Sequence, residues 1–292
     1  GVNVDVARAP RSSGSILKPF LYCDALEDGA LLPYSLIADT PVNINGFTPQ
    51  NYNMTYEGAV PAAEALSRSL NVPCVHLLKS YGVEKFMENL KARGLTTFTR
   101  SASDYGLSLI LGGGECRLDE VTAAYAEMAR EYLSVKAGRD DKVALYYTFD
   151  ALKDVNRPDE IDWHMIRSVR KVAWKTGTSY GYRDAWAVGV TPTYAVGVWA
   201  GNASGAGAPG LLGARTAGPV MFEISIFFLP VSRLGFPSRT SRRASDWKCA
   251  GSRAILQVHI AKALILCSFR RRPSEARPAL ITPWKTDAMS SA

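Results

Sequence analysis

The chain has 292 residues, of which 47% are hydrophobic and 10% aromatic, so it is long enough for one large domain or two small ones with a substantial core. Its net charge of +7 would suit a nucleic-acid or membrane partner, but residues 231–292 carry 12 Lys/Arg against 3 Asp/Glu, and residues 1–230 carry 22 against 24. The basic character belongs to the tail, and we expect no nucleic-acid partner for the main part of the chain.

Cysteine usage argues against a metal centre or a disulfide framework. The five cysteines are widely spaced and form no C-x-x-C pair, and the sequence holds three histidines. No apolar run approaches the roughly 20 residues that cross a bilayer. Residues 1–6 do not resemble a signal peptide, so an exported protein would carry its targeting signal upstream of Gly1.

The first half of the chain is predicted to be mainly helical. A helix should open at Ser15, with Pro19 in its tolerant first turn, and residues 28–60 are rich in Gly, Pro and Asn, as in loops with short extended pieces. Further helices are predicted over residues 61–70, again from Pro73, and over residues 83–93, where Gly94 closes the helix.

The second half changes from helical to strand periodicity. Residues 112–114 are three glycines that mark a turn, and residues 118–131 have apolar side chains at helical spacing. Three β-rich runs follow at residues 172–176, 184–190 and 194–200, separated by turn signals. This order predicts an α+β fold in which an antiparallel sheet packs with helices beside a mainly helical subdomain.

Ser15 and Lys18 are the first candidates for chemistry. A serine hydroxyl needs a neighbouring base to become a nucleophile, and the i, i+3 spacing places Lys18 one helical turn from Ser15. A lysine can act as that base when it is neutral, a state that burial or a second cation favours. Ser-x-x-Lys alone is weak, because it occurs by chance about once in such a chain, and residues 245–248 are a second match.

Two further motifs strengthen this interpretation. Ser69 and Asn71 offer a hydroxyl and an amide that could relay a proton and hold a substrate amide. Lys175, Thr176, Gly177 and Thr178 lie on a β-rich run, where the cation and hydroxyls can hold a carboxylate and the glycine lets a substrate backbone pass close. Ser-x-x-Lys followed by elements of these two kinds is a known signature of penicillin-binding proteins and class A β-lactamases.

The chain resembles the transpeptidase domain of penicillin-binding proteins, most closely those of the 1C type, over roughly residues 10–230. The segments that carry the resemblance are residues 14–20 (GSILKPF), 65–73 (ALSRSLNVP), 105–113 (YGLSLILGG), 173–189 (AWKTGTSYGYRDAWAVG) and 213–220 (GARTAGPV). The resemblance implies a serine β-lactamase/transpeptidase-like fold and a D,D-transpeptidase that cross-links peptidoglycan stem peptides and is acylated by β-lactam antibiotics. It also implies a membrane-anchored full-length protein at the periplasmic face of the bacterial inner membrane.

The resemblance implies a role for each motif residue. Ser15 would attack the D-Ala-D-Ala carbonyl, Lys18 would be the base, and Ser69 and Asn71 would relay protons and orient the donor. Lys175, Thr176 and Thr178 would hold the terminal carboxylate, and the backbone N–H groups of Ser15 and Thr178 would form the oxyanion hole. No metal or organic cofactor is implied.

The chain departs from the family at both ends. Only 14 residues precede Ser15, so strands that enter the sheet ahead of the nucleophile are expected to be missing, together with an anchor and a glycosyltransferase domain. We therefore divide the chain into a transpeptidase domain over residues 1–230 and a basic tail over residues 231–292. The tail is predicted to be non-native sequence or a disordered extension, with an anionic-ligand site as the third alternative.

Three other functions stay open at the level of sequence. One is a D,D-carboxypeptidase or β-lactamase, in which Glu64, Glu115 or Glu120 would have to activate water, although none of them lies in a recognisable deacylation motif. Another is a non-catalytic module that binds β-lactams or peptidoglycan, against which the intact Lys18 argues. The last is an incomplete, inactive gene product.

Overall fold

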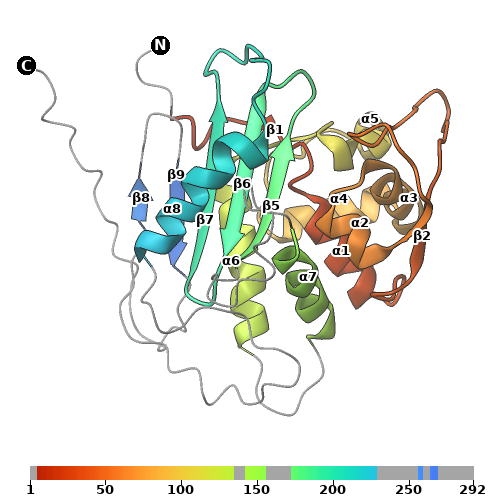
Figure 1. Ribbon diagram of the computed structural model, residues 1–292, viewed down its shortest axis with the longest axis horizontal. Helices are drawn as coiled ribbons and strands as arrows, with labels where there is room; N and C mark the ends of the chain where they lie inside the picture. Colours follow the sequence, from red (N-terminus) through yellow and green to blue (C-terminus); the bar gives the residue numbers. More distant parts are fainter. Residues whose placement is uncertain (1–4, 135–141, 156–171, 229–255, 259–263, 269–292) are drawn as a thin grey trace, which may run out of the picture.

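The computed structural model describes residues 5–134, 142–155, 172–228, 256–258 and 264–268. These residues form the predicted α+β fold, in which helices cover an antiparallel sheet (Figure 1). No helix in the described part of the chain combines the length and the hydropathy of a bilayer-spanning segment.

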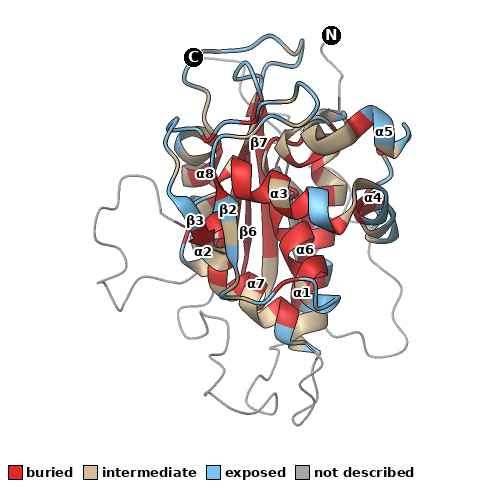
Figure 2. Cartoon of the chain, turned by 90° about the vertical axis from the view of Figure 1, so that its right-hand side faces the viewer, coloured by how far each residue is buried: buried red, intermediate tan, exposed pale blue. Residues whose placement is uncertain are grey.

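The sheet has five antiparallel strands in the order β5-β6-β7-β9-β8. Their bounds are Ala173–Thr178 for β5, Asp184–Val190 for β6, Tyr194–Gly201 for β7, Leu256–Val258 for β8 and Leu264–Ser268 for β9. The first three form the predicted meander, with Gly177 opposite Trp186 on β6 and Trp186 opposite Trp199 on β7. Every residue of β6 is buried, because helices lie on both faces of the sheet (Figure 2).

Two segments of the basic tail belong to this sheet. β9 pairs antiparallel with β7, and β8 pairs with β9. The remainder of residues 231–292 lies outside the described residues, so the predicted division into domain and tail stays a prediction.

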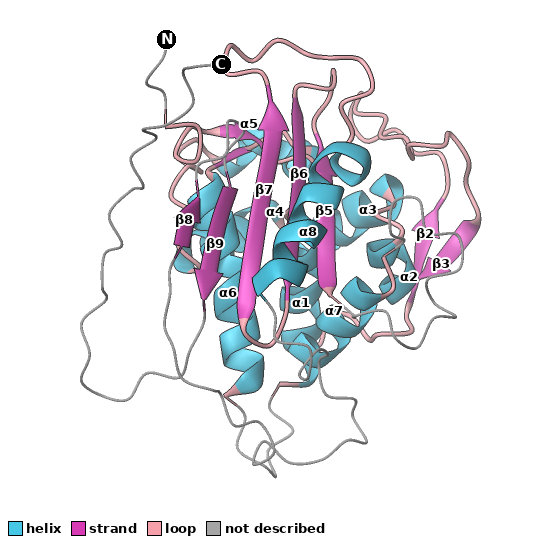
Figure 3. Cartoon of the chain, turned by 60° about the vertical axis from the view of Figure 1, so that its left-hand side comes forward, coloured by secondary structure: helices cyan, strands magenta, loops and turns pink. Residues whose placement is uncertain are grey.

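One face of the sheet is covered by α8 (Gly218–Phe228), which follows a short π-helical turn, η3 (Gly213–Ala217) (Figure 3). The opposite face packs against α6 (Leu118–Leu133) and α7 (Val143–Lys153). The helix predicted from residue 118 is thereby confirmed, whereas α7 and α8 were not predicted.

The mainly helical part surrounds α1 (Lys18–Glu27), which is buried from Lys18 to Ala25. The other elements of this part are β1 (Arg11–Ser12), β2 (Leu36–Asp39), β3 (Gly58–Pro61), α2 (Ala62–Ser67), α3 (Asn71–Tyr81), α4 (Val83–Ala92), α5 (Ala102–Tyr105), η1 (Gly106–Leu111) and β4 (Glu115–Cys116). The helices predicted over residues 61–70, from Pro73 and over residues 83–93 correspond to α2, α3 and α4.

The first helix begins later than predicted. A helix that opened at Ser15 would need the N–H of residue 19 to donate to the Ser15 carbonyl, and Pro19 has no N–H. The chain instead makes tight turns, in which Ile16 N–H donates to Ser13 O (3.1 Å) and Lys18 N–H to Ser15 O (3.3 Å). Ser15 therefore lies in a turn ahead of α1.

Candidate active site

The turn that carries Ser15 packs directly against β5. Gly14 has a φ of +52°, and a Cβ built on it would lie 2.7 Å from the carbonyl oxygen and 2.8 Å from the amide nitrogen of Thr178. A Cβ on Gly177 would likewise lie 2.8 Å from the Ser13 carbonyl oxygen. Both positions therefore require glycine, and their backbone contact brings the partly exposed Ser15 next to the Lys-Thr-Gly-Thr strand.

Contacts from distant elements hold this turn in place. The indole N–H of Trp186 on β6 donates to Ser12 O (2.8 Å), and the Tyr125 hydroxyl on α6 donates to Ile16 O (2.7 Å). The Ser13 N–H donates to Gly114 O (3.0 Å) within the predicted glycine turn. The sequence does not identify Trp186 or Tyr125 as anchors of this turn, because both contacts join segments that are far apart in the chain.

Lys18, which follows Ser15 by three residues, is the hub of a polar cluster. Its side chain is buried, and Nζ donates to Ser69 O (2.8 Å), Leu70 O (3.1 Å) and Asn71 Oδ1 (2.7 Å). Three acceptors match the three N–H donors of an ammonium group. Burial nevertheless lowers the pKa of Lys18 from 10.5 to about 8.

Ser69 connects this lysine to β5. Its carbonyl accepts from Lys18, and its hydroxyl accepts from Lys175 Nζ at 2.7 Å. Ser69 has a φ of +57°, the left-handed region that non-glycine residues seldom adopt. Lys175 is fully buried and also donates to Thr176 O (2.9 Å); burial, with a further contribution from the charge of Lys18, lowers its pKa to about 7.

β5 is the terminal strand of the described sheet, and its open edge faces the Ser15 turn. Ser179 N–H donates to Asp184 O on the β6 side (3.0 Å), so alternation points the Thr178 N–H to the opposite edge. This agrees with the closeness of Thr178 N to Gly14. The Thr178 hydroxyl accepts from Gly213 N (3.0 Å), and Thr176 and Thr178 are both partly exposed.

The structure thus brings the three predicted motifs together. Lys18, Ser69, Asn71 and Lys175 form one hydrogen-bonded cluster, and the Ser15 turn lies against Gly177 and Thr178. Such an arrangement can abstract a proton from a hydroxyl, and it offers an N–H donor on an open strand edge. Among the described residues, no group of His, Cys, Asp and Glu side chains could hold a metal ion.

The acidic residues considered for water activation have other partners. Glu64 forms an ion pair with Arg68 (2.7 Å), and Glu120 accepts from the Thr96 hydroxyl (2.6 Å) and pairs with Arg117 (3.4 Å). Glu115 lies exposed on β4. None of these contacts joins a glutamate to the lysine cluster.

Two residues near the cluster were not identified from the sequence as part of it. Cys74 on α3 is buried, and burial raises the pKa of its thiol, so a neutral thiol lies beside the two lysines. Asn51 hydrogen-bonds to the backbone at the start of α3. No sequence pattern distinguishes a loop asparagine that caps a helix 20 residues away from one that faces solvent.

Comparisons with known proteins agree with this geometry. A model of the penicillin-binding protein transpeptidase domain matches residues 3–105. Penicillin-binding protein 1C of Escherichia coli is 36% identical over 241 residues, which cover 78% of this chain and 31% of that protein. Penicillin-binding protein 1F of Bacillus subtilis is 28% identical over 224 residues, 66% of this chain and 30% of that protein, so the chain spans less than a third of the length of these relatives.

Solved structures share the fold. The PonA1 protein from Mycobacterium tuberculosis in complex with penicillin V superposes with a TM-score of 0.65 at 22% identity, covering 82% of this chain and 74% of that one. Pseudomonas aeruginosa PBP2 in complex with WCK 5153 superposes with a TM-score of 0.62 at 17% identity, covering 80% and 65%.

Proposed function

This chain belongs to the penicillin-binding protein family of transpeptidases, and we propose that it is a serine D,D-transpeptidase of peptidoglycan synthesis with Ser15 as its nucleophile. The observation that carries the proposal is the cluster in which Ser69 bridges Lys18 and Lys175, the latter on the same strand whose Gly177 and Thr178 lie against the Ser15 turn. Its donor would be a stem peptide that ends in D-Ala-D-Ala, and its acceptor an amine of a neighbouring stem.

In the first half of the reaction, Ser15 Oγ attacks the carbonyl carbon of the penultimate D-Ala while its proton passes to Lys18. The C–N bond to the terminal D-Ala breaks, its nitrogen takes up a proton, and an ester on Ser15 remains. A lowered pKa near 8 supports Lys18 as the base, because about a tenth of such amines are neutral at pH 7.

The developing negative charge on the carbonyl oxygen would be held by the backbone N–H groups of Ser15 and Thr178. The outward direction of the Thr178 N–H and its closeness to Gly14 support this assignment. One such donor contributes roughly 3 kcal/mol to transition-state stabilisation in other acyl transferases. Lys175, Thr176 and Thr178 would face the donor carboxylate, and Gly177 gives its backbone room to approach.

In the second half, the acceptor amine attacks the ester, a new C–N bond forms, and Ser15 Oγ leaves with a proton. A β-lactam would acylate Ser15 in the same way. Its amine leaving group stays tethered to the acyl group and would block the acceptor, so the adduct would persist.

The partners follow from this chemistry. We expect peptidoglycan stem peptides and β-lactam antibiotics as ligands, at the extracytoplasmic face of the inner membrane. Anchoring to that membrane is expected of the full-length protein.

Labelling with a fluorescent penicillin, followed by peptide mass mapping, tests the proposal. We expect one adduct on the peptide that contains Ser15, no adduct in Ser15→Ala, and full labelling of Ser245→Ala, which removes the second Ser-x-x-Lys match. Folded protein that does not label, or Ser15→Ala protein that does, would refute the assignment.

The fate of the acyl group separates transfer from hydrolysis. A transpeptidase should exchange the terminal D-Ala of a model pentapeptide for an added D-amino acid and should lose a penicillin adduct slowly. Rapid penicillin turnover would favour the hydrolase, and the partners of Glu64 and Glu120 do not support that alternative.

A further inference from the structure

The N-terminus of α3, which supplies the acceptors of Lys18, is capped by a residue far away in the chain. Leu70 at the N-cap position makes no side-chain cap, and its own N–H donates to Ala65 O (2.9 Å). The next two N–H groups, of Asn71 and Val72, both donate to Asn51 Oδ1, at 2.9 and 3.2 Å. Pro73 has no N–H, so Asn51 completes the first turn of α3.

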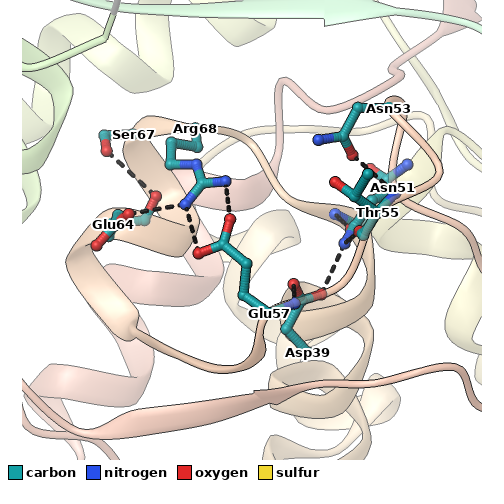
Figure 4. A network of polar contacts seen from close by, with 9 residues as sticks. Asp39, Asn51, Asn53, Thr55, Glu57, Glu64, Ser67 and Arg68 are labelled. Atoms are coloured by element: carbon teal, nitrogen blue, oxygen red, sulfur yellow. Dashed lines mark hydrogen bonds and ion pairs between the residues drawn. The ribbon is translucent and has the colours of Figure 1, made fainter.

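Asn51 is held in the orientation that this cap requires. Its Nδ2 donates to Asp39 Oδ1 (2.6 Å) and Thr55 O (2.9 Å), and Asp39 Oδ2 accepts from Glu57 N (3.0 Å) (Figure 4). Asn51 and Asp39 are each 1% exposed. Because a carboxylate and a carbonyl accept hydrogen bonds, they select the amino end of Asn51 and turn its oxygen toward α3.

The same loop also holds the side chain of Asn71. Asn71 Nδ2 donates to Gln50 O (2.8 Å), which leaves Oδ1 for Lys18 Nζ at 2.7 Å. Gln50 and Asn51 therefore fix the side chain and the backbone of the residue that contacts the base.

We propose that Asn51, oriented by Asp39, is a positioning residue that sets Asn71, and through it Lys18 Nζ, for proton transfer from Ser15. The inference rests on the proposed function, because it assigns Lys18 as the base. Asn51 acts through Asn71, and no contact of Asn51 with Lys18 is required.

Loss of this support has a definite electrostatic consequence. The titratable groups that face Lys18 are Lys175 on β5 and the neutral thiol of Cys74 on α3. The charged groups around Asn51 are Asp39 and Glu57, and Glu57 is paired with Arg68. If the start of α3 moves away, water reaches Lys18 and its pKa rises toward 10.5. Less neutral base is then present at neutral pH.

A charge-swapped pair tests the proposal. In Asn51→Asp, the new carboxylate faces the carboxylate of Asp39, and the two repel each other. In the double variant Asn51→Asp with Asp39→Asn, the side chain at position 39 can donate to the carboxylate at position 51, and the summed charge equals that of the wild type. Asn53→Asp is the matched control, since exposed Asn53 lies in the same loop and its side chain accepts from Thr55 N (3.3 Å) without touching α3.

Two measurements are made on each folded variant: the second-order rate of acylation by fluorescent penicillin from pH 6 to 10, and the pKa of Lys18 from ε-carbon NMR. Asn51→Asp should be acylated about tenfold more slowly at pH 7, the usual scale for one hydrogen bond to a charged group. Its rate should rise at higher pH than in the wild type, and the Lys18 pKa should increase. The double variant should recover both properties in part, because the new aspartate has no N–H for the Thr55 carbonyl, and Asn53→Asp should match the wild type.

The outcomes separate this inference from the proposed function. Wild-type protein that does not label contradicts the function, and the Lys18 titration then decides the positioning role. An unchanged Lys18 pKa and rate in Asn51→Asp, no recovery in the double variant, or an equal loss in Asn53→Asp would each overturn the inference. Should Asn51→Asp fail to fold, Asp39→Asn alone, which removes the charge that orients Asn51, must show a smaller shift in the same direction.

Discussion

Lys18 and Lys175 lie in two different regions, the α1–α3 corner and the terminal strand of the sheet, yet both are buried and both contact Ser69. Lys18 donates to three acceptors around the start of α3, whereas Lys175 donates to the Ser69 hydroxyl and the carbonyl of its own neighbour Thr176. Burial lowers the pKa of Lys18 to about 8, whereas burial together with the charge of Lys18 lowers the pKa of Lys175 to about 7. The two identical side chains thus differ in their acceptors and in their pKa, and the proposed function gives them different roles.

Removing each amine in turn tests most directly whether Lys18 and Lys175 contribute differently to acylation. Lys18→Met should slow acylation by about a thousandfold, within the range for loss of a general base. Lys175→Met should slow it about tenfold to a hundredfold, because the Ser69 hydroxyl loses a charged donor. Acylation rates with fluorescent penicillin would show this order, and equal losses would mean that the two lysines are not distinguished as described.

The backbone contact between the Ser15 turn and β5 can be disturbed without changing any polar side chain. Gly14→Ala would place a methyl group against the Thr178 amide, and acylation should fall about a hundredfold, the scale for loss of one oxyanion donor. Gly29→Ala is the matched control, since Gly29 has a φ of +67° and nothing within 4 Å of a Cβ. It should carry the left-handed strain with an unchanged acylation rate, and a comparable loss there would show that strain alone explains the effect.

Ser69, the residue common to both regions, allows backbone and hydroxyl to be separated. Ser69→Ala and Ser69→Gly both remove the acceptor of Lys175, so both should slow acylation about tenfold. They should differ in stability, with the glycine variant more stable by about 1 kcal/mol, because glycine tolerates the φ of +57°. Urea unfolding measures that difference, and equal stabilities would contradict it.

The smallest expected effect is that of pH on the wild type. Acylation should increase about fivefold from pH 7 to 8 as Lys18 with a pKa near 8 loses its proton. Stability should also rise from about pH 7, because the folded protein then binds fewer protons than the unfolded chain, whose lysines stay charged toward 10.5. Acylation that falls between pH 7 and 8, or unfolding free energies that fall there, would contradict these directions.

The sequence predicted the residues of the candidate site better than the residues and helices that hold them in place. The motifs around Ser15, Ser69 and Lys175 were recognisable because their chemistry needs those side chains at those spacings, and the β5–β7 meander followed from strand periodicity. The roles assigned to these residues remain predictions. The start of α1 differs from the prediction, because Pro19 is tolerated in a first turn but lacks the N–H that a helix opening at Ser15 would need for the Ser15 carbonyl.

The supports depend on pairs that are distant in the chain. The cap of α3 by Asn51 and the anchoring of Ser12 by Trp186, 174 residues away, have no local signal. The helices α7 and α8 lie in apolar stretches whose period does not identify them as helical. Such contacts are specified by the assembled fold, and a single sequence does not reveal them.

The wide separation of these contacts has a consequence for folding. Lys18 meets Ser69 across 51 residues, Lys175 meets Ser69 across 106, and Trp186 meets Ser12 across 174. Closing such long loops is slow relative to forming helices, so the Ser15 turn and the lysine cluster should be among the last features to be assembled. A refolding chain would regain its helical circular dichroism before it could be labelled by penicillin. The time at which labelling appears would therefore measure the rate of the final folding step.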